Sequence, residues 1–498
     1  MSRAERLVLL GALALGVFVR LYPSFGADGP IGDGGLFYAM VEDVRRAGLG
    51  IPATTSYNEL GIPFVYPPLA ILATAALGQA AGVPTLDLLT WVPPLLAIAS
   101  LGAFALLAMR CLPPMAAALA TATYALMPHA YDWVVGGGGL TRGLGLTLAL
   151  LAAAVACGRL RRRRDVVLAG VLIGVAGLSH PQAAIFGLMA VTVLSFERDR
   201  AWVPRIAAVA GISLIVFAPW LAVVAATHGI GALLAAGNRL EPAIGLVRLL
   251  NLEFAGAPFM NVFVVPATVG IFLAVVRGSW RILVLLLLTY LLGAGGGEYL
   301  AAVPWSLLAG IGAAGIVDLV ARDWRLPRGS RLPVTLGSTA LLVLLAIIGS
   351  IGSSADRSSK LQALGSDRLE AMRWAADNLS SDAGIVVATV DVWGDDEISE
   401  WLPAIAGRHS IGTVQGSEWL GVDGFERQLA AHEAIRDCAG HTAACYRAVA
   451  PDAVIFVPKG PIAGPLSQDD CCPALRETLE DDGYEIVYDG PGATIAIP

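Results

Sequence analysis

An aspartate between glycines lies just after the first apolar segment of the chain, in the sequence Gly32-Asp33-Gly34-Gly35. Acidic side chains at the mouth of a bundle of membrane helices are costly to place and are usually functional. A carboxylate in this position can take a proton from a reacting hydroxyl as a general base. We therefore predict that Asp33 is a catalytic base. Asp28, five residues earlier, either shares this role at the substrate or is a solvated loop acid.

The alternative interpretation of Asp33 is structural. Apolar residues recur at helical spacing over residues 36–47 and are opposed by charged residues, which predicts an amphipathic helix lying at the membrane interface. Aspartate is a favoured residue at the N-cap of a helix. Asp33 is therefore either a base or the cap of this helix.

A second group of chemically capable residues follows the third apolar segment. Asp132 precedes a run of four glycines that ends at Gly139, and Arg142 follows that run. Glycines allow backbone amides to approach an anion closely. We predict that Asp132 is a second catalytic acid and that Arg142 and His180 bind a phosphate. The alternatives are a turn with an arginine reaching the interface and a structural histidine.

Composition places the chain among polytopic membrane proteins. Of its 498 residues, 56% are hydrophobic and 15% are charged, against about 25% charged in soluble domains. Residues 1–350 contain 23 basic and 16 acidic residues, whereas residues 351–498 contain 10 basic and 24 acidic residues. An acidic tail argues against a nucleic-acid partner, because phosphates attract the opposite charge.

Apolar stretches of about 17 to 25 residues can cross a bilayer. On this basis the sequence predicts about eleven transmembrane helices in a membrane domain formed by residues 1–351. They are expected at residues 7–23, 88–109, 114–131, 141–158, 166–180, 183–196, 203–225, 259–276, 282–295, 300–318 and 332–351.

Arginines set the predicted orientation, because positive residues stay on the cytoplasmic side. The arginine-rich loops share one side only if residues 66–82 do not cross, so Tyr66-Pro67-Pro68 is predicted to open an interfacial or re-entrant helix. The amino terminus is then cytoplasmic in the cell membrane. Two long outer loops result, residues 24–87 and 227–258, the second carrying Arg239, a candidate ligand for lipid head groups.

Residues 352–498 are predicted to form an extracytoplasmic α/β domain, because helix-like and strand-like runs alternate there. Helices are expected at residues 368–379, 397–406 and 472–482, and strands at residues 384–390, 453–457, 484–487 and 493–497. An acidic and aromatic cluster extends from Trp393 to Trp401 and includes Trp419, a composition suited to carbohydrate. The alternative is a strand-to-helix loop with buried tryptophans and solvated charges.

Six cysteines divide between the two parts. Cys111 and Cys157 are expected to be buried thiols in the membrane part. Four cysteines in the tail suit disulfides in an oxidising compartment, and we expect Cys438 to bond Cys445. Their spacing does not match a zinc site.

The pattern of a first-loop acid, a following proline pair and eleven spans resembles the GT-C class of integral-membrane glycosyltransferases, and within it the aminoarabinose transferases and protein O-mannosyltransferases. The resemblance implies that Asp33 is the base, that Asp132 is the acid at the outer end of the third segment, and that Tyr66 and Tyr299 line the substrate site. It further implies a polyprenyl-phosphate sugar donor from the membrane lipid phase and a glycan, lipid or protein acceptor. No cofactor is certain, although a divalent cation stays open.

Two alternatives from other classes remain at this point. A polytopic transporter would be expected to show inverted repeats or paired broken helices, and neither is evident in the sequence. A membrane-anchored carbohydrate-binding protein without catalysis would not need eleven spans.

Overall fold

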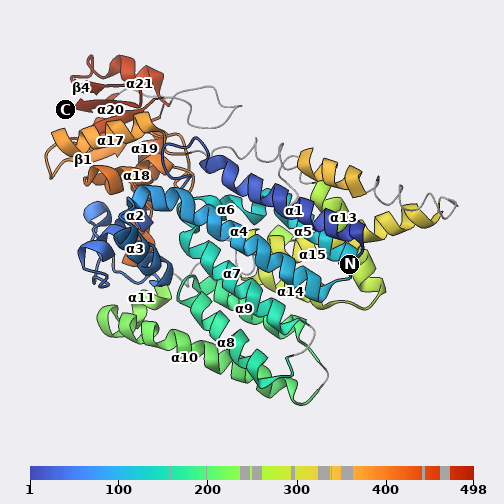
Figure 1. Cartoon of the computed structure of the whole chain (residues 1–498). Helices are drawn as coiled ribbons and strands as arrows, with labels where there is room; N and C mark the ends of the chain where they lie inside the picture. Colours follow the sequence, from blue (N-terminus) through green and yellow to red (C-terminus); the bar gives the residue numbers. More distant parts are fainter. Residues whose placement is uncertain are drawn as a thin grey trace.

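A computed structural model describes residues 1–157, 160–197, 199–235, 247–249, 261–292, 298–323, 337, 339–348, 363–439, 443–459 and 471–498. Within these residues five helices are apolar and long enough to cross a membrane: Arg3–Ser24, Thr85–Cys111, Gly139–Ala156, Trp202–His228 and Tyr299–Val320. The chain is therefore a helical membrane protein (Figure 1).

Each of the eleven predicted segments contains a helix. The long helices are α1 (Arg3–Leu21), α4 (Thr85–Cys111), α7 (Gly139–Ala156), α10 (Trp202–His228) and α15 (Glu298–Asp323). Shorter ones are α5 (Pro114–Leu126), α8 (Arg163–Gly177), α9 (Pro181–Leu194), α13 (Asn261–Val276), α14 (Arg281–Leu291) and Thr339–Ile348. The number of crossings stays a prediction, since the shorter helices do not settle it.

Close backbone approach holds part of this bundle together. A Cβ atom on Gly312 of α15 would lie 1.8 Å from the carbonyl oxygen of Pro266 in α13, and one on Gly270 of α13 would lie 1.9 Å from that of Leu308. Lipid tails are as apolar as helix side chains, so the hydrophobic effect does not drive membrane helices together. Small residues at such crossings let the helices approach closely and pack by van der Waals contact. Larger residues at either position would push the two helices apart.

The carboxyl end of α1 is anchored by a buried charge. The guanidinium of Arg20 donates to the carbonyl oxygens of Ala125 at 2.8 Å and Tyr124 at 3.1 Å, and it lies over the ring of Tyr131. These acceptors belong to the carboxyl end of α5, where helix carbonyls lack partners within the helix. Arg20 therefore ties α1 to the start of the Asp132 segment.

The loop after α1, which is predicted to lie outside, carries two helices, α2 (Gly35–Arg46) and α3 (Leu69–Ala81). Helix α3 has 13 residues and spans about 20 Å at 1.5 Å per residue, the same length as α5. Its length therefore does not test the prediction that residues 66–82 do not cross. The predicted membrane-facing orientation of α2 is wrong, because its apolar face is buried in protein, with Met40, Val41 and Val44 fully covered.

The tail contains a five-stranded sheet in the order β2-β1-β3-β5-β4. Strands β2 (His409–Ile411), β1 (Gly384–Val387) and β3 (Val454–Pro458) are parallel, whereas β5 (Ala493–Ile497) is antiparallel to both of its neighbours, β3 and β4 (Glu485–Asp489). The helices are α17 (Ser366–Asn378), α18 (Glu397–Ala406), α19 (Val422–Asp437), α20 (Ala443–Val449) and α21 (Pro473–Thr478). The sequence analysis missed β2, α19 and α20; β2 has only three residues, too few to show an alternating pattern.

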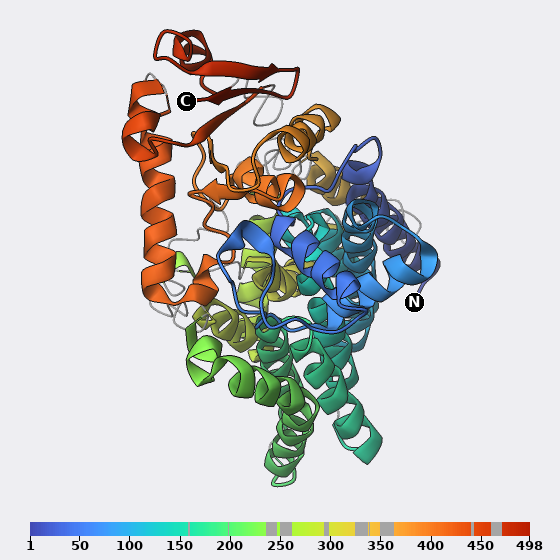
Figure 2. The same cartoon turned by 90° about the vertical axis from the view of Figure 1, so that its left-hand side faces the viewer.

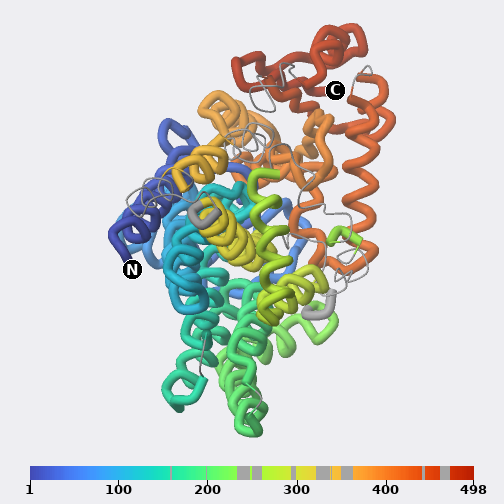
Figure 3. The backbone as a smooth tube through the Cα atoms, turned by 90° about the vertical axis from the view of Figure 1, so that its right-hand side faces the viewer, coloured from blue at the N-terminus to red at the C-terminus, as the bar shows by residue number. Residues whose placement is uncertain are grey.

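One hydrophobic core joins the tail to the first outer loop. Leu36 and Met40 of α2 share it with Met372 of α17 and with Trp401 and Leu402 of α18. Figures 1 and 2 show α18 directly above α2, and Figure 3 shows the tail above the membrane helices from the opposite side. The predicted domain boundary between residues 351 and 352 lies outside the described residues.

The expectation of free thiols at Cys111 and Cys157 is wrong, since the two form a disulfide in the structure. They end α4 and α7, which lie side by side, and their Cα atoms are 5.7 Å apart, within the range of disulfides. The two cysteines are 46 residues apart, so no local sequence pattern indicates that they are neighbours in space. In the tail, Cys438 bonds Cys445 as predicted, and Cys471 bonds its neighbour Cys472.

Candidate active site

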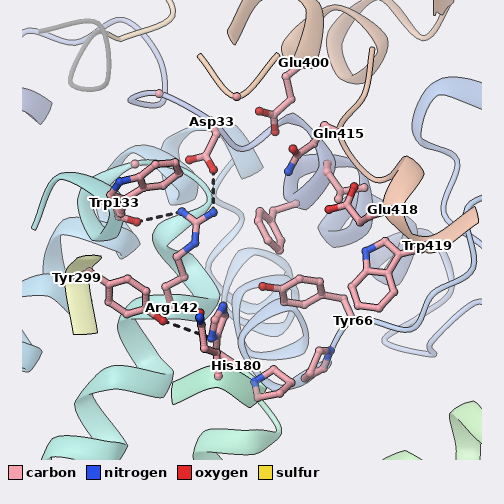
Figure 4. Close-up of a pocket in the computed structure, with 18 of the residues that line it drawn as sticks. Asp33, Tyr66, Trp133, Arg142, His180, Tyr299, Glu400, Gln415, Glu418 and Trp419 are labelled. Atoms are coloured by element: carbon pink, nitrogen blue, oxygen red, sulfur yellow. Dashed lines mark hydrogen bonds and ion pairs between the residues drawn. The ribbon is translucent and has the colours of Figure 1, made fainter. Parts of the chain in front are cut away.

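A cavity of about 730 Å³ lies where the membrane helices meet the tail. The membrane part contributes most of the predicted site residues, and the tail contributes acids and aromatic residues (Figure 4). The predicted residues that line it are Asp33, Tyr66, Asp132, Arg142, His180 and Tyr299. Six side chains spread over more than 260 positions of the sequence are thereby brought together.

Asp33 does not cap α2, so the capping interpretation is wrong. The N-cap position is Gly34, and no side chain caps this helix. The carboxylate of Asp33 instead accepts the backbone N–H of Gly138 at 3.1 Å on Oδ1 and the guanidinium of Arg142 at 3.1 Å on Oδ2. The side chain remains 23% exposed, and it lines the cavity. Asp33 is therefore fixed in place yet accessible from the cavity.

The glycine run approaches an anion, and that anion is Asp33. A Cβ atom on Gly138 would lie 2.3 Å from Oδ2 of Asp33, and one on Gly137 would lie 2.4 Å from the Asp33 carbonyl oxygen. The Gly138 amide also donates to that carbonyl at 2.9 Å. Only glycine fits between the two loops, so the run serves to seat the carboxylate.

Arg142 lies in the first turn of α7 and faces Asp33. Its Nη1 donates to the carbonyl oxygen of Trp133 at 3.1 Å, and the guanidinium carbon lies 5.1 Å from the centre of the Trp133 ring. A guanidinium has five N–H donors. Within the described residues its hydrogen bonds run from Nη1 to the Trp133 carbonyl oxygen and from Nη2 to Asp33, so N–H donors remain for a ligand in the cavity.

Tail residues hold the other side of the Asp33 loop. The indole Nε1 of Trp401 donates to the carbonyl oxygen of Gly32 at 2.8 Å, and Oε1 of Glu400 accepts the N–H of Gly34 at 3.0 Å. Gly34 has a φ of 150°, and a Cβ on Gly35 would lie 2.3 Å from the Glu400 carbonyl oxygen. The loop therefore sits between α18 and the glycine run, and glycine is required on both faces.

Three aromatic residues and one imidazole form the floor of the cavity. The hydroxyl of Tyr299 lies 3.5 Å from Nδ1 of His180, and the hydroxyl of Tyr66 lies 3.0 Å from Oγ1 of Thr141. The Tyr66 ring meets the ring of Trp419 edge to face. His180 precedes α9 and faces the same space as Arg142 (Figure 4).

The other predicted residues differ in their positions. Asp132 lines the cavity but is 2% exposed; its Oδ1 accepts the N–H of Trp133 at 2.8 Å, and its Oδ2 lies 3.9 Å from Nδ1 of His129. Its role as a catalytic acid stays a prediction. Asp28 is exposed and does not line the cavity. Arg239 lies outside the described residues.

Charges on the tail side of the cavity influence one another. Burial and the nearby Asp33 carboxylate raise the pKa of Glu400 to about 8. Burial, followed by the charges of Asp33 and Glu400, raises the pKa of Glu397 well above its usual value. Asp396 is an N-cap, because its Oδ1 accepts the N–H of Ser399 at 3.1 Å. The acids of the predicted cluster are thus buried or line the cavity and are not solvated.

The donor set does not fit a metal ion within the described chain. No group of three or more histidine, cysteine, aspartate or glutamate side chains is arranged there to bind one. Both oxygens of Asp33 already accept hydrogen bonds, one of them from a cation. The position next to Asp33 that a divalent cation would take is held by Arg142.

The sequence analysis did not single out Gln182, Gln415 or Glu418, all of which line the cavity. Gln182 follows His180 and Pro181 at the start of α9, which was a usable signal. Gln415 and Glu418 follow β2, a strand that the sequence did not reveal, and Glu418 lies in the short 3-10 helix Ser417–Leu420.

The fold is similar to that of the GT-C class of integral-membrane glycosyltransferases. No protein-family model matches the sequence, and no curated protein matches it.

Solved structures give the particular likenesses. The Archaeoglobus fulgidus oligosaccharyltransferase tethered with an acceptor peptide has a TM-score of 0.60 at 14% identity, covering 91% of this chain and 69% of that one. ArnT from Cupriavidus metallidurans in the apo state has a TM-score of 0.58 at 14% identity, covering 98% and 97%. The same protein bound to undecaprenyl phosphate has a TM-score of 0.56 at 13% identity, covering 100% and 98%. At these identities the likeness establishes the fold.

Proposed function

We propose that this chain is a membrane glycosyltransferase that moves a sugar from a polyprenyl-phosphate donor to an acceptor hydroxyl on the extracytoplasmic face. The observation that carries the proposal is the Asp33–Arg142 pair, which places a carboxylate and a cation side by side in a cavity of about 730 Å³. Glycosyl transfer from a phosphate requires both a proton acceptor and a stabiliser of the departing charge. The similarity to GT-C folds supports the same conclusion.

The proposed reaction is a single displacement with inversion. The acceptor oxygen bonds to the anomeric carbon while the bond from that carbon to the phosphate oxygen breaks. Asp33 takes the hydroxyl proton, and the electron pair of the broken bond leaves with the phosphate, whose charge Arg142 stabilises through its remaining N–H donors. His180, beside Arg142, donates to or orients the same phosphate.

Apolar residues of α9 and α10 give the cavity a wall that suits an isoprenoid chain. Ile185, Phe217, Trp220 and Leu221 all line it, and Ile185 is 45% exposed at the outer surface of the helices. A lipid donor entering from the bilayer would keep its chain in contact with such side chains. Solved neighbours of this fold are described as bound to undecaprenyl phosphate and to a dolichol-phosphate, which is consistent with a polyprenyl donor here.

One neighbour, with a TM-score of 0.52, is described as a complex with Zn and sulfate. Since the described residues of this chain do not form a metal site, we assign no step to a metal. Arg142 supplies the positive charge next to Asp33. The acceptor is a glycan, lipid or protein hydroxyl, and the orientation is the one that arginine placement predicts, with the tail and the cavity outside.

The test is sugar transfer by the purified full-length protein in lipid nanodiscs. A panel of radiolabelled polyprenyl-phosphate sugars is incubated with cell-envelope acceptors, and the anomeric configuration of the product is determined by NMR. The proposal expects turnover of at least one donor with inversion at the anomeric carbon. Absence of transfer from every donor, with intact folding, would refute it.

A further inference from the structure

The disulfide bonds of the described chain lie at two opposite ends of the molecule. Two of them, Cys438–Cys445 and Cys471–Cys472, belong to the tail. The third joins Cys111 at the end of α4 to Cys157, which caps the carboxyl end of α7. Figure 1 shows α4 running from the tail side of the molecule to the end at which the amino terminus lies. The Cys111–Cys157 bond is therefore at the end of the bundle remote from the tail.

Helices that can cross a membrane separate the two ends. Helix α4 begins at Thr85, whose hydroxyl accepts from Arg45 of α2 at 2.8 Å, on the side where α2 packs against the tail. From there its 27 residues extend about 40 Å, more than the roughly 30 Å of a bilayer core. Helices α4 and α7 are both long and apolar enough to cross. With both helices crossing, disulfides lie on both sides of the membrane, and one of those sides is the cytoplasm, where thiols are normally kept reduced.

Arginines mark the Cys111–Cys157 end as the cytoplasmic one. Arg110 directly precedes Cys111, and a run of four arginines, Arg161 to Arg164, follows Cys157; all of them are exposed. Positive residues of this kind are retained on the cytoplasmic side of a membrane protein. The tail pairs are then outside, where disulfides persist, whereas the third pair faces a compartment in which disulfides are usually transient or redox-sensing.

We propose that Cys111 and Cys157 form a reversible redox site on the cytoplasmic face, which is oxidised by a low-molecular-weight disulfide of the glutathione class and reopened by the matching thiol. The bond in the structure is the oxidised state of this site. Both cysteines are half-buried, so part of each side chain is accessible to a small molecule. Their Cα atoms are 5.7 Å apart, which allows the bond to close without movement of the backbone.

The exchange proceeds in two balanced steps. The thiolate of one cysteine attacks a sulfur of the incoming disulfide, which forms a mixed disulfide and releases one small thiolate. The second cysteine, as its thiolate, then attacks the protein sulfur of that mixed disulfide, which forms the Cys111–Cys157 bond and releases the second small thiolate. The two cysteines together lose two electrons and two protons, and the incoming disulfide gains them and becomes two thiols.

Exposed arginines next to Cys157 favour an anionic reagent. Arg162 and Arg163 lie at the start of α8, and both are exposed. The nearest acid in the sequence, Asp165, pairs with Arg164 at 3.5 Å. Glutathione disulfide has more carboxylates than amino groups, so its net charge is negative. A positive patch raises the local concentration of such a molecule and its rate of association.

Contacts other than the bond hold α4 and α7 together, so the site can open without unfolding. Nη1 of Arg110 in α4 donates to the carbonyl oxygen of Ala154 in α7 at 2.9 Å. Farther along the pair, a Cβ atom on Gly143 of α7 would lie 2.9 Å from the Cβ of Leu96 in α4. The reduced form therefore keeps the same helix pair, and the cysteines stay close enough to be oxidised again.

The first experiment measures the state of the cysteines in cells that express the full-length chain. Cells are quenched in acid, free thiols are alkylated, and the peptides are identified by mass spectrometry. We expect Cys111 and Cys157 to be alkylated, and Cys438 and Cys445 to be found as a disulfide. Diamide, which converts cellular glutathione to its disulfide, should lower the alkylated fraction at Cys111 about tenfold, and removal of diamide should restore it. A Cys111–Cys157 bond in untreated cells, or thiols that diamide leaves unchanged, would overturn the proposal.

The second experiment tests the exchange chemistry on purified full-length protein in nanodiscs. Cys111→Ser removes the resolving thiol, so glutathione disulfide should trap Cys157 as a mixed disulfide, seen as added mass on its peptide. The double variant Cys111→Ser with Cys157→Ser is the control for this peptide. A folded Cys111→Ser protein that takes up no glutathione at Cys157 would contradict the proposed reaction.

The role of the arginines is tested with two oxidants. Arg162→Gln combined with Arg163→Gln should slow oxidation by glutathione disulfide about threefold at low salt, because it removes the attraction for an anion. Oxidation by uncharged hydroxyethyl disulfide should keep its rate. Arg373→Gln combined with Arg427→Gln is the matched control, since both arginines are exposed in the tail. Equal rates with glutathione disulfide in both double variants would remove the arginines from the site.

None of these measurements involves sugar transfer. The redox site and the proposed function are therefore supported or refuted separately.

Discussion

The indole of Trp401 donates a hydrogen bond to the carbonyl oxygen of Gly32 across 369 positions of sequence. Trp401 is fully buried in α18, and Gly32 immediately precedes the proposed base. The tail therefore holds the loop that carries Asp33. Contacts of this kind set the geometry of a site through groups that never touch the substrate.

Trp401→Phe removes the indole N–H and replaces the indole with a smaller aromatic ring. A buried carbonyl without its donor costs about 1–3 kcal/mol, and the Asp33 loop should become less well fixed. We expect kcat to fall while the KM for the donor stays within about twofold, because Arg142 still binds the phosphate. Trp374→Phe, at an aromatic contact with Tyr488 away from the cavity, is the control. Equal effects of both substitutions on kcat would count against a positioning role.

Asp33→Asn should preserve the fold and remove the base. Loss of a general base costs about 10²- to 10⁴-fold in rate, roughly 3 to 5 kcal/mol of barrier. Asparagine can still accept the Gly138 amide, so melting temperature and expression should change little. Turnover is measured with the polyprenyl-phosphate donor. A well-folded variant that turns over at the wild-type rate would remove Asp33 from the mechanism and direct attention to Asp132.

Arg142→Gln should lower kcat/KM for the donor by about 10²- to 10³-fold, because it removes a preorganised charge from the departing phosphate. Arg142→Lys keeps the charge but not the planar fork that contacts Asp33 and the Trp133 carbonyl together, so an intermediate rate is expected. Donor affinity is measured separately by competition with polyprenyl phosphate. Equal activity of the glutamine and lysine variants would show that charge at this position is irrelevant.

Glu400 should make stability depend on pH. Its pKa is about 8 in the folded protein and 4.5 as the ordinary value, so between these values the folded state binds more protons than the unfolded state. The contribution of Glu400 to the free energy of unfolding is therefore fully present below about pH 4.5 and is lost as pH rises toward 8. Glu400→Gln should flatten that part of the profile of melting temperature against pH, with Glu433→Gln as the control. A wild-type slope retained in Glu400→Gln would assign the dependence to another group.

Orientation can be tested with two single cysteines. Glu433→Cys on exposed α19 should react with a membrane-impermeant maleimide in intact cells. Arg3→Cys at the start of α1 should react only after permeabilisation. The reverse pattern would invert the predicted topology.

Local patterns were sufficient for much of the fold. Helical segments, the short α3, the strand at residues 493–497 and the Cys438–Cys445 bond all depend on neighbours in the sequence, and the structure contains each of them. Asp33, Arg142 and His180 could be grouped because each follows or precedes an apolar segment on the same predicted side.

Long-range packing accounts for the failures. The pattern of α2 shows an apolar face but not what covers it, and the tail core covers it where lipid was expected. Asp28 was left open as a sharer of the role of Asp33, yet only Asp33 meets Gly138 and Arg142. The Cys111–Cys157 bond and the role of Glu400 depend on contacts between segments that no local spacing connects.

The clamp on the Asp33 loop has a consequence for biogenesis. The loop is synthesised before its partners, because Glu400 and Trp401 follow it by more than 360 residues. Until α18 has been synthesised and has docked, Gly32 and Gly34 lack their partners and the apolar face of α2 lacks its cover. Under the proposed function, the site is complete only once α18 has docked, and a chain that inserts into the membrane without α18 has no finished site with which to consume lipid-linked sugar.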